Sequence, residues 1–117
     1  MPLLRRSVAI LERAVGANHP DVATVLVALV EAELLTGAAE AVEHAERAAA
    51  IRTTDASTEI KDRGEAEFLT ARALARRGER ARAAAMASLA RATYARAESE
   101  NQAKIAEIDA WLKKQGR

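Results

Sequence analysis

Two glycines 41 residues apart, Gly37 and Gly78, each follow a helix-forming segment rich in alanine and leucine and precede another that is rich in alanine. The same offset places Ala9-Ile10 over Ala50-Ile51. A recurring offset of this size that joins matching helix ends is typical of arrays of stacked helical repeats. Such arrays usually present binding surfaces, so this feature favours a binding scaffold over an enzyme.

Composition narrows the class of protein. At 117 residues the chain is one domain or part of one. Its 18 basic and 17 acidic residues are interspersed, which argues against the basic stripe of a nucleic-acid-binding surface. Cysteine is absent, so disulfides and thiolate metal sites are excluded. No apolar run approaches the roughly 18 residues that span a bilayer, and the amino-terminal segment is amphipathic, unlike a signal peptide. We therefore expect a cytoplasmic protein that binds neither nucleic acid nor membranes.

The spacing of apolar residues predicts six helices and no strand. Glycines at the ends of three of these helices suit a left-handed terminating conformation. We expect helices over about residues 2–15, 20–36, 38–53, 62–78, 79–97 and 99–115.

Capping residues indicate where the fourth and sixth helices start. The fourth helix could be capped by Asp55, by Ser57 or by Asp62. We prefer Asp62, because an earlier start places Gly64 inside the helix at a cost of about 1 kcal/mol. The sixth helix is expected to start at Ser99, with Gln102 completing a reciprocal capping pair.

The segment from Leu3 to Thr24 resembles the tetratricopeptide repeat family in its longer, kinesin-light-chain-like form. It looks like the second helix of one unit, a Gly…His-Pro-Asp-Val-Ala connector and the first helix of the next unit. Further matching positions are Leu29-Val30, the turn at Gly37, the small residues Ala41, Ala45 and Ala48, and the ending Ala50-Ile51. A weaker copy has Ala71 and Leu74 before Gly78 and Ala83, Ala87 and Ala90 after it; it lacks the His-Pro-Asp connector, and Thr70 replaces a large apolar residue.

This resemblance implies an all-α fold, an α-solenoid of antiparallel helix pairs in a right-handed superhelix. The chain 1–117 would be a single domain. It would contain the second helix of a truncated repeat (2–16), one repeat (20–53), a degenerate repeat (57–98) and a capping helix (99–115). Such arrays occur in bacterial signalling proteins, including the C-terminal regions of serine/threonine kinases and of nucleotide-binding switch proteins. We expect the chain to be a fragment or a degraded copy of such a protein.

The resemblance also implies a protein or peptide partner on the concave face, which the first helix of each unit lines. The residues selected in this way are Thr24, Val27, Glu31, Leu34, Glu65, Phe68, Arg72 and Arg76. Phe68, an aromatic residue flanked by charge, is the expected anchor for a partner. No enzymatic activity, cofactor or metal is expected. The alternative is a structural or oligomerisation segment with no other ligand, and a third hypothesis, RNA binding, is disfavoured by the near-neutral charge.

Several polar and aromatic residues could have structural rather than functional roles. His19 and His44 lie far apart and are interpreted as a connector residue and a solvated helix residue, not as metal ligands. Glu33 replaces an aromatic residue of the family and would be either a buried anchor for an arginine or an edge residue. Trp111 is expected in the core. Four arginines surround the last inter-helix turn: Arg72, Arg76, Arg77 and Arg80. They form either a solvated face or a binding site for an acidic peptide.

The first helix lacks the preceding helix of its own repeat. Its apolar residues should therefore leave an uncovered patch, and monomeric proteins seldom expose large patches. We expect self-association through Leu4, Val8 and Leu11, as a two-fold homodimer that pairs first helices. The last helix carries the polar outer face of a terminal cap.

Overall fold

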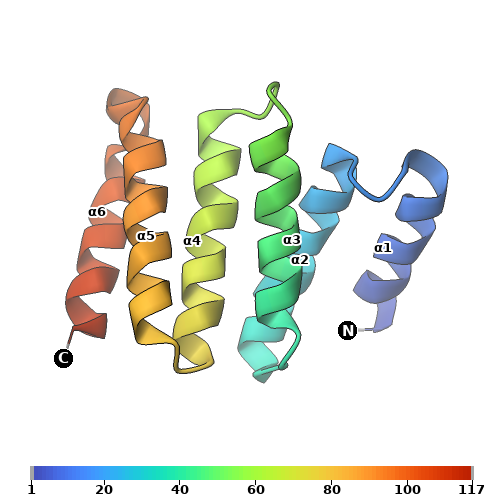
Figure 1. The fold of residues 1–117 in the computed structure, drawn as a ribbon, viewed down its shortest axis with the longest axis horizontal. Helices are drawn as coiled ribbons and strands as arrows, with labels where there is room; N and C mark the ends of the chain where they lie inside the picture. Colours follow the sequence, from blue (N-terminus) through green and yellow to red (C-terminus); the bar gives the residue numbers. More distant parts are fainter. Residues whose placement is uncertain (1, 117) are drawn as a thin grey trace.

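The computed structural model describes residues 2–116, which form six α-helices and no strand. They are α1 (Pro2–Val15), α2 (Pro20–Thr36), α3 (Ala41–Thr54), α4 (Ile60–Arg76), α5 (Arg80–Ala95) and α6 (Glu98–Gln115). Successive helices run in opposite directions and pack side by side, in an elongated array of 41 × 31 × 19 Å (Figure 1). The all-α solenoid of antiparallel helix pairs is therefore confirmed.

The helices form two rows. The inner row consists of α2, α4 and α6, in which α4 contacts both of its neighbours. The outer row consists of α1, α3 and α5, whose backbones do not approach one another. In Figure 1, α2 lies behind α3, and α6 lies behind α5. The inner helices all run in the same direction, so their C-terminal ends lie at one edge of the array.

Small residues allow close packing between the helices. Alanines on α4 and α5 are fully buried, which brings the two backbones together. Gly64 has a specific packing role: a Cβ there would lie 2.7 Å from the ring of Tyr94, so only glycine leaves room for the ring. This contact explains a glycine near the start of a helix, where propensity alone disfavours it by about 1 kcal/mol.

Several predicted helix ends are confirmed. Gly16, Gly37 and Gly78 have positive φ angles, of 98°, 74° and 88°, and follow the ends of α1, α2 and α4. His19 is the N-cap of α2, because its Nδ1 accepts a hydrogen bond of 3.0 Å from the amide of Asp21. This cap gives the connector histidine a structural role that spacing alone did not reveal.

Other predicted ends are wrong. α3 begins at Ala41 rather than residue 38, since residues 38–40 form the turn. α4 begins at Ile60, before the expected cap Asp62. The other proposed cap, Asp55, accepts hydrogen bonds from the Ser57 amide and hydroxyl at 2.9 and 2.7 Å, which stabilises the loop. α5 ends at Ala95, two residues early.

The capping pair predicted for α6 is also wrong. The helix begins at Glu98, and no side chain caps it. Asn101 has non-helical angles, φ −124° and ψ 20°, and kinks the helix. Its side-chain amide donates to the carbonyl of Ala97 at 3.0 Å, which also accepts from the amide of Glu100 at 3.1 Å.

Candidate protein-binding groove

A groove of about 360 Å³ lies at the C-terminal edge of the inner row. All three inner helices contribute to it: Leu34 and Leu35 from α2, Arg72, Ala75 and Arg76 from α4, and Trp111 and Gln115 from α6. The C-terminal end of a helix carries a partial negative charge, which favours cations such as Arg76 in the last turn of α4. The arrangement therefore combines apolar surface with positive charge.

Leu35 and Trp111 supply the apolar part of the groove. Leu35 is 86% exposed, although the adjacent Leu34 is buried. Trp111 is half-buried, and its ring meets that of Phe68 edge to face, with centroids 5.5 Å apart. Trp111 therefore packs between α6 and α4, in agreement with the expected core position, and it also forms one wall of the groove.

Arg72 and Arg76 supply the charge. Arg72 Nη1 lies 3.4 Å from Glu31 Oε1, across the α2–α4 contact. Arg76 is exposed, and no ion pair joins it to another residue of 2–116. Its neighbour Arg77 is engaged elsewhere, with Glu43 at 3.1 Å and with Glu79. Hydrogen bonds from Arg77 and Arg82 hold the pKa of Glu79 below its ordinary value. Of the arginines singled out in the sequence, Arg72 and Arg76 therefore face the groove.

The structure divides the eight residues expected on the concave face. Leu34, Arg72 and Arg76 line the groove, and Glu31 contacts Arg72. Thr24 lies in a separate depression beside Arg52, and Glu65 pairs with Arg52 at 2.8 Å. Val27 is buried.

Phe68 requires a correction. It is only 5% exposed, because α6 packs over it through Trp111. The expectation that its ring is accessible to a partner is wrong. Sequence reasoning also missed Leu35, Ala75 and Gln115 as groove residues. Other adjacent apolar pairs of α2, such as Leu29 and Val30, are both buried, so the sequence carried no signal that Leu35 would be exposed.

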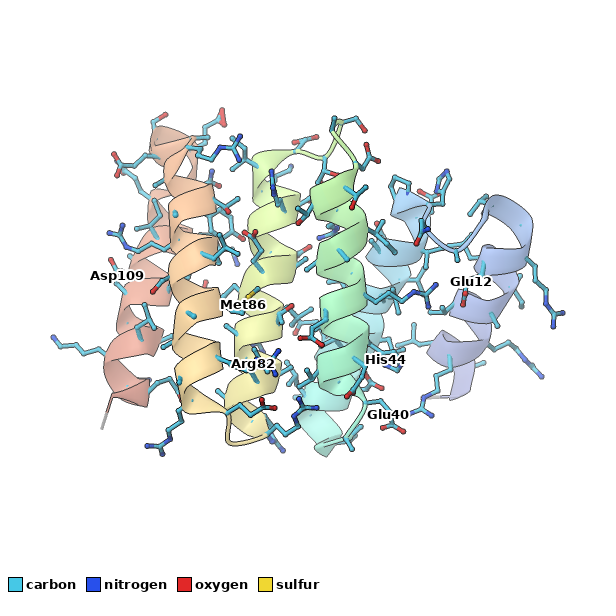
Figure 2. The ribbon with its side chains drawn as sticks, viewed as in Figure 1. Glu12, Glu40, His44, Arg82, Met86 and Asp109 are labelled. Atoms are coloured by element: carbon cyan, nitrogen blue, oxygen red, sulfur yellow. The ribbon has the colours of Figure 1, made fainter. Side chains whose placement is uncertain are left out.

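A cluster of polar side chains around Glu33 connects α1, α2 and α3. The Glu33 side chain is fully buried, and its two carboxylate oxygens lie 2.9 and 3.0 Å from Nδ1 of His44. Arg5 of α1 approaches the same carboxylate at 3.6 Å and Glu40 at 3.6 Å. His44 and Glu40 lie near the start of α3 in Figure 2. The prediction of a solvated His44 is wrong. Glu33 is indeed a buried anchor, although its shortest contact is with a histidine.

The residues expected to mediate self-association face inward. Val8 is buried, and Leu4 and Leu11 are partly buried against the core that α2 contributes to. The most exposed large apolar residues of α1 are instead Leu3 and Ile10, which are 77% and 61% exposed. The expectation of an open patch on α1 therefore applies to a different face of the helix.

The chain matches no family model, no curated protein and no solved structure. Within residues 2–116, no group of three or more histidine, cysteine or acidic side chains could hold a metal ion. None of the helices in this part of the chain is both long and apolar enough to cross a membrane.

Proposed function

We propose that this chain is a helical-repeat module of the tetratricopeptide kind that binds a protein or peptide and is not an enzyme. The observation that supports this most directly is the groove, because all three inner helices line it with apolar and cationic side chains. The proposal includes a cytoplasmic location and a place within a larger bacterial signalling protein, as the sequence resemblance implies.

The chemistry of the groove specifies the ligand. Leu35 and Trp111 offer apolar surface to one large side chain, and the arginine forks of Arg72 and Arg76 suit carboxylates. The Glu31 carboxylate that now contacts Arg72 is half-exposed, and pairs of this kind contribute roughly 0–1 kcal/mol. A ligand carboxylate could replace it at little cost. We therefore propose an acidic segment that carries an aromatic or large aliphatic residue.

Selection from a random peptide display library tests this proposal. The immobilised chain should enrich peptides that combine aspartate or glutamate with a large apolar residue. A variant with Leu35→Ser and Arg76→Glu should lose these peptides, because it removes the apolar contact and reverses one charge. Leu89→Ser, which changes an exposed leucine on α5, is the matched control and should retain them. Enrichment of no common sequence, or enrichment that the double variant leaves intact, would exclude the groove as the binding site.

A structural or oligomerisation role is the second candidate. The observation that favours it is the exposure of Leu3 and Ile10 on α1. Light scattering at tens of micromolar distinguishes the two proposals. A concentration-dependent rise in mass together with failed peptide selection supports oligomerisation, and a monodisperse monomer that selects peptides supports the binding module.

A further inference from the structure

The outward face of α1 carries an apolar stripe with positive charge along one side. Leu3, Ser7, Ile10 and Ala14 recur at helical spacing and are all exposed. Arg6 and Arg13 border this stripe on the side away from the core-facing Val8. No ion pair joins Arg6 or Arg13 to another residue of 2–116. The other charged residues of α1, Arg5 and Glu12, form ion pairs on the side that faces α3 and its preceding turn.

The 41-residue offset shows what covers the equivalent stripe elsewhere in the array. It aligns Leu3, Ser7 and Ile10 with His44, Ala48 and Ile51 of α3. Ala48 and Ile51 are buried in the core cluster to which α2 contributes more residues than any other helix, and His44 contacts Glu33 of α2. The stripe on α3 is therefore covered by an apolar helix that also carries a carboxylate. The backbone of α1 contacts α2 alone, through its other face, so its own stripe has no such cover among residues 2–116.

Two ion pairs show which charge an arginine of the outer row meets on a neighbouring helix of that row. Arg47, which the offset aligns with Arg6, lies 3.0 Å from Glu12 of α1. Arg82 of α5 likewise lies 2.8 Å from Glu46 of α3 (Figure 2 labels Arg82 and Glu12). In both pairs the later helix supplies the arginine and the earlier helix supplies the glutamate. Among residues 2–116, no glutamate of another helix pairs with Arg6 in this way.

We infer that this stripe is a docking surface for an amphipathic helix of a partner protein. The apolar side of that helix covers Leu3 and Ile10, and acidic residues along its edge pair with Arg6 and Arg13. A second copy of this chain suits the surface poorly, since pairing α1 with α1 would bring four arginines together around one apolar seam. This surface is separate from the groove of the inner row, so the inference does not depend on the groove binding a ligand.

Two synthetic helical peptides test the inference. Both have a leucine stripe; one has glutamates on both sides of it, and the other has lysines at the same positions. Binding of each fluorescently labelled peptide to the full chain is measured by anisotropy. The glutamate peptide should bind at least about tenfold more tightly than the lysine peptide, a difference of 1.4 kcal/mol. Arg6→Glu combined with Arg13→Glu should reverse this preference.

Substitutions locate the bound peptide. Ile10→Ser should weaken binding of the glutamate peptide by about tenfold, because the side chain is the centre of the stripe. Leu89→Ser on α5, which lies outside both surfaces, should leave it unchanged, and circular dichroism of each variant verifies that the helices remain. A loss with Leu35→Ser but not with Ile10→Ser would place the peptide in the groove and overturn the inference.

Three further results would also overturn it. The first is equal binding of the two peptides, which would show that charge does not select the partner. The second is a concentration-dependent dimer that Ile10→Ser dissolves, which would make a second copy the occupant. The third is Ile10-dependent binding to phosphatidylserine-containing vesicles without binding to the glutamate peptide, which would make a membrane surface the occupant.

Discussion

At the scale of single residues, Glu67 is an acidic side chain whose burial is only partly compensated by polar contacts. It is buried between α4 and α5, and its Oε1 has no hydrogen-bond partner, as is also true of Nε of the nearby Arg63. Burial raises the pKa of Glu67, and this effect outweighs a hydrogen bond with Thr93 and the positive charges of Arg63 and Arg96. The folded state therefore holds the proton more tightly than the unfolded state does.

This shift makes stability depend on pH in a defined direction. The contribution of Glu67 is most favourable below the ordinary glutamate pKa of about 4.3, where both states are protonated. It is lost as the pH rises through the raised folded-state pKa, because the folded state must then bury a charge. Glu67→Gln removes the charge, so we expect it to stabilise the chain by about 1 kcal/mol at neutral pH.

Urea unfolding between pH 4 and pH 7 measures this effect. The advantage of Glu67→Gln should grow with pH and vanish near pH 4. Glu59→Gln changes an exposed glutamate of the same region and should show no such trend. A wild-type chain that gains stability relative to Glu67→Gln as the pH rises would contradict the assignment.

At the scale of helices, the sequence predicted most boundaries because local signals determine them. The prolines at the starts of α1 and α2 and the three terminating glycines act within one turn of the chain. The kink at Asn101 could not be predicted, since one of its side-chain contacts is with the carbonyl of Tyr94 on the preceding helix. The start of α4 was also missed, because the packing of Tyr94 against Gly64 is a tertiary contact.

The difference between local signals and contacts between helices also explains which residues of the candidate site were predicted correctly. Three of the eight expected concave residues line the groove, because the alternation of antiparallel helices determines that α2 and α4 share a face. Phe68 was expected to be accessible, but its ring packs against Trp111 of α6. That contact depends on the path of α6 after the kink at Asn101, which spacing within α4 cannot predict. The partner of Glu33 was misjudged because His44 lies on another helix, and spacing within one helix cannot reveal that contact.

The Glu33–His44 contact between α2 and α3 should contribute strongly to the free energy of unfolding. The Glu33 side chain is fully buried, so His44→Ala, which removes its shortest contact, should cost about 3 kcal/mol. Replacing both residues by leucine should recover most of this loss, because the buried carboxylate is then absent. Chemical denaturation of the two variants measures the difference.

A more exposed pair, between α2 and α4, provides the control. Glu31→Ala breaks the half-exposed contact with Arg72 and should cost less than about 1 kcal/mol. If His44→Ala were as mild as Glu31→Ala, the Glu33 carboxylate would be satisfied by other groups, with Arg5 as the nearest.

At the scale of the whole molecule, stability should decline from the centre of the array towards α1. α4 contacts α2, α3, α5 and α6, whereas the backbone of α1 approaches α2 alone. In a linear array each helix is stabilised mainly by its nearest neighbours, so an end helix can open without the rest. Two exposed ion pairs, Arg5–Glu40 and Glu12–Arg47, add little to hold α1 in place.

Hydrogen exchange followed by mass spectrometry tests this gradient. Amides of α4 should be the slowest to exchange, and those of α1 should exchange at least about tenfold faster through local opening. Val8→Ala and Ile108→Ala each remove a buried side chain, one at each end of the array, at a cost of about 2 kcal/mol. Val8→Ala should accelerate exchange in α1 only, and Ile108→Ala should do so in α6 and the adjoining part of α5. If either substitution accelerated all six helices equally, the array would unfold as a single cooperative unit, and docking on α1 would then stabilise the groove as strongly as it stabilises α1 itself.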